Sequence, residues 1–194
     1  MKRFVLMLAL LVAVQWAAAQ PAQIILIRHA EKPDSPDAVH LSKAGEKRAK
    51  NLVPFITSDA ELTKYGLPVA LFATGTTKHG RGQRTQETIT PLATELKLPV
   101  EAPYQSENYG VLAKMILANR QYEGKTVLIC WNHEEIPQLA AALGVHPQPP
   151  KWKDNVYDRV YLISYHDGKA TLQDLPQKLS PKGGKPRKHQ EKIN

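Results

Sequence analysis

Hydrophobic residues in this chain occur in two patterns, short unbroken runs and helical spacing. The branched apolar run 24–27 leads into Arg28 and is typical of a strand buried on both faces. Runs at 68–74 and 126–131 predict two more buried strands, and 98–101 predicts a short one. Alternation over 156–165, a turn signal at 166–169 and the segment 170–175 predict a hairpin.

Helical spacing fills the stretches between these runs. It predicts helices over 42–53, 83–96 and 108–119, and one from 132 to 143. Strands that alternate with helices indicate an α/β fold. We expect a three-layer, mostly parallel sheet with helices on both faces and an antiparallel edge hairpin near the C-terminus.

The two ends of the chain differ from this pattern. Residues 1–19 have a basic start, an apolar run and three alanines at 17–19, which is typical of a signal peptide. The alternative, an uncleaved anchor, is disfavoured because the apolar run is short for a membrane span. We therefore expect a domain at 20–177 that is exported and is periplasmic or secreted after cleavage.

Charge and cysteine content add two constraints. The formal net charge is +8, and much of the excess lies in a Lys-, Gly- and Pro-rich tail at 178–194, which we expect to be disordered. Its simplest role is to aid solubility; the alternative is weak contact with anionic surfaces, without specific nucleic-acid binding. Cys130 is the one cysteine, so no internal disulfide is expected, and its apolar setting predicts a core residue rather than a nucleophile.

Polar side chains gather where the predicted strands end. Arg28 and His29 follow the first strand, Arg84 opens the helix after the second, and His133 follows the strand at 126–131. The carboxyl ends of parallel strands share one edge of a sheet, where ligands of open α/β folds bind. Two guanidinium groups and two imidazoles near helix amino ends predict an anion pocket.

Four segments, in this order, resemble motifs of one family. They are Arg28-His29-Ala30, the Leu-Ser-Lys-Ala-Gly-Glu-Lys-Arg-Ala stretch at 41–49, Arg-Thr-Gln-Glu-Thr at 84–88, and the strand into a histidine at 127–133. Together they resemble the histidine phosphatase superfamily, with its phosphoglycerate-mutase-like fold, and in particular its small exported bacterial members. The family's first motif is Arg-His-Gly, so Ala30 is a departure.

The resemblance implies a reaction and roles for these residues. His29 would be the nucleophile that becomes phosphorylated, while Arg28, Arg84 and His133 would hold the phosphoryl oxygens. The implied activity is hydrolysis of phosphomonoesters or phosphohistidine. It needs no metal or cofactor, because cationic side chains supply the charge stabilisation.

The proton donor for the leaving group is not fixed by these motifs. Glu134 directly follows His133, which resembles the arrangement in one branch of the family, and Glu107 lies roughly where the other branch has its acid. The simpler alternatives are a first-turn carboxylate that stabilises its helix, for Glu134, and a solvated helix cap, for Glu107. We favour Glu134 because covalent geometry keeps it beside His133.

Two other functions fit parts of the pattern. A metal hydrolase would use His29, His133 and a carboxylate, but Pro137 breaks the His-Glu-x-x-His pattern and two arginines disfavour a cation. A phosphate-binding protein without turnover would need only the pocket. The short loops at 34–40, 75–82 and 101–108 predict an open site for phosphorylated small molecules or phosphoproteins, in a protein that we expect to be a monomer.

Several other residues have simpler interpretations. His79 is expected to be a solvated loop residue, with a role in shaping the substrate pocket as the alternative. Trp152 and Tyr157 are expected to pack rather than to bind a ligand. Arg48 fits either a solvated helix position or, by the family pattern, a structural role near the pocket.

Overall fold

A computed structural model describes residues 20–35 and 37–179. The signal peptide predicted at 1–19 and most of the predicted tail, 180–194, lie outside this range, so both stay predictions. The last two described residues contact the domain: Lys178 lies 3.3 Å from the Asp59 carboxylate, and Leu179 packs against the core.

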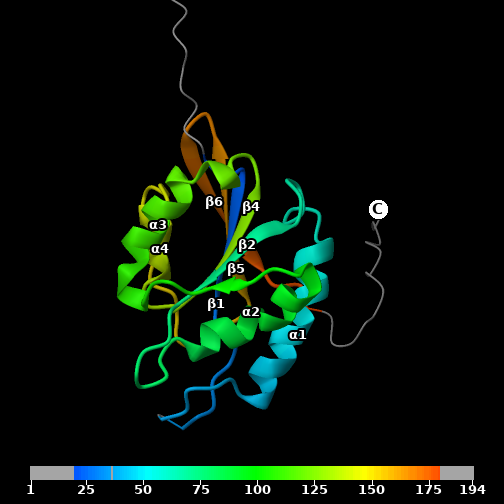
Figure 1. The fold of residues 1–194 in the computed structure, drawn as a ribbon, viewed down its shortest axis with the longest axis vertical. Coiled ribbons are helices and arrows are strands. Elements are labelled where there is room, and N and C mark those ends of the chain that lie inside the picture. The colour runs from blue at the N-terminus through cyan, green and yellow to red at the C-terminus, as the bar shows by residue number, and fades with distance from the viewer. Residues whose placement is uncertain (1–19, 36, 180–194) are drawn as a thin grey trace, which may run out of the picture.

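One mixed sheet of six strands organises the described chain, in the order β3-β2-β4-β1-β5-β6 (Figure 1). The first four strands in this order run parallel, whereas β5 is antiparallel to both β1 and β6. The predicted α/β fold with an antiparallel edge hairpin is therefore confirmed. The strands are β1 (Gln23–Arg28), β2 (Pro68–Ala73), β3 (Val100–Glu101), β4 (Thr126–Trp131), β5 (Arg159–His166) and β6 (Lys169–Pro176).

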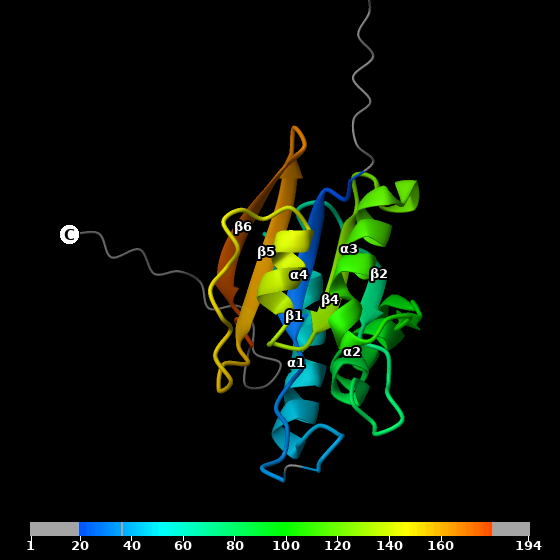
Figure 2. The same cartoon turned by 90° about the vertical axis from the view of Figure 1, so that its left-hand side faces the viewer.

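Four α-helices of the described chain cover the two faces of this sheet (Figure 2). Alternate residues of β1 point to opposite layers: Ile24 and Leu26 pack with α3 and α4, and Ile25 and Ile27 pack with α1 and α2. All four are completely buried, which explains the unbroken apolar run. The helices are α1 (Lys43–Ser58), α2 (Gln83–Leu96), α3 (Tyr109–Ala118) and α4 (Ile136–Ala142), and the short 3₁₀ helices are η1 (Ser106–Asn108) and η2 (Arg120–Tyr122).

Three element boundaries differ from the sequence-based expectation. Helix α1 continues through Pro54 to Ser58, because Phe55 and Ile56 beyond the proline are buried in the core. Helix α4 begins at Ile136, not at 132, and the preceding residues form a turn. Strand β5 begins at Arg159, so the first residues of the predicted strand 156–165 belong to a loop.

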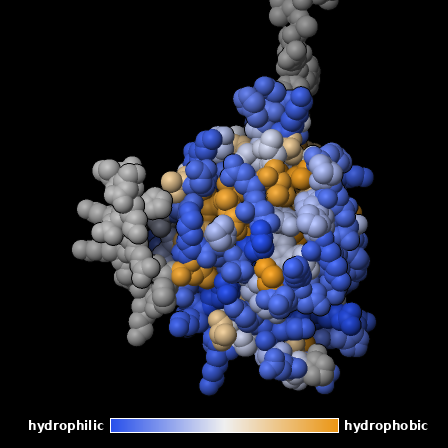
Figure 3. All heavy atoms as spheres, turned by 180° about the vertical axis from the view of Figure 1, so that it is seen from behind, coloured by the Kyte–Doolittle hydropathy of each residue, from blue (hydrophilic) through white to orange (hydrophobic). Residues whose placement is uncertain are grey.

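The face turned away from the viewer in Figure 1 is mainly hydrophilic, with small separate hydrophobic patches (Figure 3). Single exposed hydrophobic side chains of this kind are normal on protein surfaces. Within the part of the chain that the structure describes, no helix is long and apolar enough to cross a membrane.

Candidate active site

The four residues predicted to converge line one cleft of about 680 Å³. Arg28 is the last residue of β1, His29 follows it, Arg84 is the second residue of α2, and His133 lies two residues after β4. Because β1, β2 and β4 are parallel, their carboxyl ends meet at this edge of the sheet. Arg28 and His29 are 1% and 3% exposed, so the cleft reaches the buried end of the sheet.

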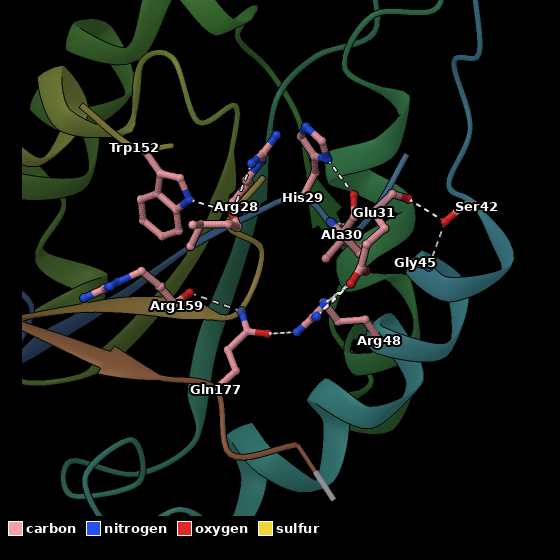
Figure 4. Close-up of polar contacts among 12 residues, drawn as sticks. Arg28, His29, Ala30, Glu31, Ser42, Gly45, Arg48, Trp152, Arg159 and Gln177 are labelled. Carbon is pink, nitrogen blue, oxygen red and sulfur yellow. Dashed lines mark hydrogen bonds and ion pairs between the residues drawn. The ribbon is translucent and has the colours of Figure 1, made fainter. Parts of the chain in front are cut away.

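The ring of His29 is fixed by its own backbone neighbour. Its Nδ1 atom lies 2.7 Å from the carbonyl oxygen of Ala30 (Figure 4). A carbonyl only accepts, so Nδ1 donates the proton and the lone pair of the neutral ring is on Nε2. The Ala30 N–H in turn donates to the Thr88 hydroxyl, 2.8 Å away, and that hydroxyl donates to the Arg84 carbonyl. The nucleophile candidate and the start of α2 are thereby linked.

Electrostatics keep His29 uncharged. Burial lowers the pKa of its imidazole to about 3, and the charges of Arg28, Arg84 and His133 act in the same direction, against the opposing hydrogen bond to Ala30. A ring with this pKa is neutral throughout the physiological range. Its Nε2 lone pair is therefore free to attack an electrophile without a separate base.

Arg28 is held by the loop between α4 and β5. Its Nη1 donates to the carbonyl oxygens of Lys153, Asp154 and Val156 at 3.2, 2.7 and 3.0 Å. Its guanidinium carbon lies 4.0 Å from the centre of the Tyr157 ring, a cation–π geometry. The same ring meets His29 edge-on at 6.0 Å between centroids. Tyr157 therefore packs against two residues of the cleft, Arg28 and His29, where the loop folds back over the end of β1.

His133 is positioned by the same loop. Its Nε2 lies 3.0 Å from Oδ1 of Asp154, and its ring centroid lies 6.4 Å from that of His29. Burial and the charge of Arg28 lower the pKa of His133, while the Asp154 carboxylate opposes the shift. Arg84 is anchored through Nη1, which donates to the Ala38 carbonyl at 2.6 Å.

Three buried nitrogen atoms in this cleft have no hydrogen-bond partner within residues 20–35 and 37–179: Nε of Arg28, Nε of Arg84 and Nδ1 of His133. Only two other buried side-chain atoms of the described chain share this property, and both are glutamine oxygens. Buried polar groups are normally paired. The two arginine Nε–H groups can donate to the oxygen atoms of an anion, and Nδ1 of His133 can do so once its ring is protonated.

Three carboxylates also line the cleft: Glu107, Glu134 and Glu135. The structure brings both sequence candidates for the proton donor, Glu134 and Glu107, to the cleft, where each is exposed. Glu135 is half-buried and accepts a hydrogen bond from the Ser106 hydroxyl at 2.8 Å. Burial raises the pKa of Glu135, helped by the charges of Glu134 and Glu107 and opposed by Ser106.

The structure also shows the positions of the residues for which the sequence suggested simpler roles. Arg48 has the structural role, because its guanidinium binds both carboxylate oxygens of Glu31 at 2.7–3.0 Å. Trp152 is buried and packs on Tyr161, as expected for an interior residue. His79 is exposed but lines the cleft. Among the described residues, no group of three or more His, Cys, Asp or Glu side chains is arranged to hold a metal ion.

Comparison with known proteins gives matches by structure. The sequence matches no family model and has no match among the curated proteins. The structure is similar to an alpha-ribazole phosphatase from Shigella flexneri, with a TM-score of 0.54 and 16% identity over 79% of this chain and 96% of that one. It is also similar to a phosphoserine phosphatase mutant from Entamoeba histolytica in complex with phosphoserine, with a TM-score of 0.52 and 13% identity over 80% of this chain and 96% of that one.

These neighbours define the class of fold. The chain has the phosphoglycerate-mutase-like fold that the motifs predicted, as these two solved structures show.

Proposed function

We propose that this chain is a metal-independent phosphatase that hydrolyses phosphomonoesters, or phosphohistidine, through a phosphohistidine at His29. The observation that carries the proposal is that Arg28, Arg84 and His133 line one cleft with a neutral His29, and that each of the three has a buried nitrogen without a hydrogen-bond partner in the described chain. A phosphoryl group held by these three side chains would lie against the imidazole of His29. The phosphatase names of the two structural neighbours support the same activity.

In the proposed reaction, Nε2 of His29 attacks phosphorus while the bond from phosphorus to the leaving oxygen breaks. The arginines and His133 stabilise charge on the equatorial oxygens. We propose Glu134 as the acid that protonates the leaving alkoxide, with Glu107 as the alternative. Water then attacks the phosphohistidine, its proton passes to the carboxylate, and phosphate leaves the restored His29.

Trapping of the phosphoenzyme tests the proposal. The protein is mixed with ³²P-labelled substrate, quenched, and divided between acid and alkali. We expect a label that is labile in acid and stable in alkali, which is absent in His29→Asn and present in His166→Asn. His166 is a matched control because its side chain is exposed. It is the last residue of β5, and nearby residues of that strand pair with the start of β1. A label that persists in His29→Asn would overturn the assignment of the nucleophile.

A phosphate-binding protein without turnover is the second candidate, since the same unpaired nitrogens would satisfy a bound phosphate. It predicts vanadate or phosphate binding that depends on Arg28 and Arg84, with no label and no release of p-nitrophenol from its phosphate ester. Equal p-nitrophenol release with and without a chelator supports the metal-independent phosphatase instead.

We further propose that the protein acts outside the cytoplasm as a monomer, on a phosphorylated small molecule or phosphoprotein. The support is the signal-peptide pattern at 1–19 and the open cleft. Mass spectrometry of protein from the periplasm or medium tests this, and a mature chain that begins at Gln20 is the expected result. A full-length chain in the cytoplasmic fraction would refute it.

A further inference from the structure

The cleft contains more positive charge than one phosphoryl group requires. Lys32 and Arg81 line it in addition to the four residues described above. Neither forms an ion pair with any carboxylate of the described chain, and the same is true of Arg84. Two exposed cations that line the cleft are therefore free to bind a ligand.

The cations and the carboxylates of the cleft come from different segments of the chain. Lys32 lies in the connection from β1 to α1, and Arg81 lies in the connection from β2 to α2. The carboxylates come from η1 and from the turn before α4, and the charges of Glu107 and Glu134 both act on Glu135. An anionic group beside the phosphoryl site is attracted to Lys32 and Arg81 and repelled by the carboxylates.

The backbone that carries Lys32 is fixed by its neighbour. The Glu31 carbonyl accepts hydrogen bonds from the N–H and the hydroxyl of Ser42, at 3.0 and 3.2 Å. Its carboxylate is paired with Arg48, and Arg48 donates to the side chain of Gln177 at 2.9 Å, as Figure 4 shows. The backbone directly before Lys32 is therefore held in place at the edge of the cleft.

Arg81 has an equally defined support. The loop between β2 and α2 closes on itself, because the Thr77 N–H donates to the Arg81 carbonyl at 2.9 Å and the Arg81 N–H donates to the Thr77 hydroxyl at 3.2 Å. At its end Gly82 adopts φ +95° and packs so closely on Gly75 that an added Cβ would lie 2.3 Å from the Gly75 carbonyl oxygen. The loop thus presents Arg81 to the cleft from a compact backbone.

We propose that Lys32 and Arg81 bind a second anionic group of the substrate. The preferred substrates are phosphomonoesters whose alcohol part carries a carboxylate or a further phosphate a few bonds from the reacting phosphorus. The inference rests on the proposed phosphatase function, and it selects a substrate class for that site. A neutral or cationic alcohol part leaves both side chains without a partner.

Matched phosphonates test this without requiring that the true substrate is known. 3-Phosphonopropionate and propylphosphonate differ by a terminal carboxylate in place of a methyl group, and both are measured as competitive inhibitors of p-nitrophenyl phosphate hydrolysis. We expect the carboxylate compound to bind roughly tenfold more tightly, as for a charged hydrogen bond, and the preference to shrink at high salt. Propane-1,3-bisphosphonate should show the same preference.

The variants Lys32→Met and Arg81→Met should each reduce the ratio of the two inhibition constants by roughly three- to tenfold. Lys78→Met is the control, because this exposed lysine lies in the same loop but does not line the cleft. It should leave the ratio as in the wild type. Circular dichroism confirms that each variant is folded.

Failure of this inference is distinguishable from failure of the proposed function. If p-nitrophenyl phosphate is hydrolysed through His29 but the two phosphonates bind alike, the second anion site is refuted and the phosphatase stands. The second anion site is also refuted if the wild type shows the preference and both variants retain it. If no phosphohistidine forms at His29 and no p-nitrophenol is released, the proposed function itself is wrong.

Discussion

The Nε2 atom of His133 lies 3.0 Å from Oδ1 of Asp154, and the buried Nδ1 atom on the other side of the ring has no partner in the described chain. A carboxylate only accepts, so Nε2 carries a proton. In a neutral ring Nδ1 is then an acceptor, which cannot donate to a phosphoryl oxygen. His133 must therefore gain a second proton when it binds an anion.

This geometry predicts that anion binding takes up a proton. Burial and Arg28 lower the pKa of free His133, and a bound anion would raise it. The affinity for sulfate, whose own charge is constant, should fall as pH rises between these two pKa values, by up to about tenfold per pH unit. Sulfate inhibition measured from pH 5 to 8 checks this.

Two variants sharpen the test of His133. Asp154→Asn should move the decline in sulfate affinity to lower pH, because Asp154 favours the protonated ring. Asp167→Asn, in the exposed β5–β6 turn, should change nothing. Sulfate affinity that is independent of pH in the wild type would contradict the proposed role of His133.

His29 should make the stability of the protein depend on pH. Its pKa is about 3 in the folded state and near 6.5 when exposed, so below pH 6.5 the unfolded state binds more protons. The free energy of unfolding is unaffected by this group above pH 6.5 and should fall as pH decreases from 6.5 toward 3, by on the order of 1 kcal/mol per pH unit.

Urea denaturation between pH 7 and pH 4 measures this slope. His29→Gln should reduce it, whereas His166→Gln should not, because the His166 side chain is 90% exposed. An identical slope in the wild type and in His29→Gln would show that His29 titrates normally in the folded protein.

Substrates with different leaving groups can show which of the three cleft carboxylates is the general acid. Loss of a general acid should slow alkyl phosphate hydrolysis by about 10²–10⁴-fold but p-nitrophenyl phosphate little, because nitrophenolate leaves without a proton. We expect this pattern for Glu134→Gln. Glu135→Gln should slow both substrates to the same degree, because Glu135 holds Ser106 and, through it, Asn132. The selective pattern in Glu107→Gln or Glu135→Gln would transfer the role to that residue.

Gly45 is the position in α1 where a small change should be costly. A Cβ at this position would lie 2.3 Å from the Glu31 carbonyl oxygen. Because the clash is with backbone atoms, no side chain can move to remove it. Gly45→Ala should destabilise the protein by about 1–3 kcal/mol in chemical denaturation, as overpacking does. Gly110→Ala, in α3 with no atom within 4 Å of the added Cβ, should be neutral or stabilising. Equal effects of both would contradict the tight contact at Glu31.

Much of the fold was predictable because its determinants are local. The branched residues 24–27 are buried on both faces and alternate between the two layers, as their pattern indicated. The end of α1 was not predictable in this way, because Pro54 normally ends a helix and only the burial of Phe55 and Ile56 explains its continuation. The start of α4 had a usable signal in Pro137, which is favoured in a first turn.

The candidate site was likewise predictable only in part. The convergence of Arg28, His29, Arg84 and His133 follows from strand ends in a parallel sheet, so the sequence sufficed to predict it. The support from the loop before β5 was missed, because Arg28 is held there by backbone carbonyls, which have no residue signature. Asp154 lies outside the four motifs, and only the tertiary fold brings it to His133.

The sheet order also determines when, during synthesis, the strand that leads into the proposed nucleophile gains its neighbours. β1 is the first strand of the sheet in the chain, yet its neighbours, β4 and β5, lie at 126–131 and 159–166. During synthesis its branched apolar residues stay without partners until most of the domain has been made, which exposes them to chaperones and to aggregation. Contacts of such long sequence separation also slow folding. Any product that ends before residue 153 leaves one edge of β1 open and Arg28 without the carbonyls that hold it, so the proposed site is incomplete in such chains.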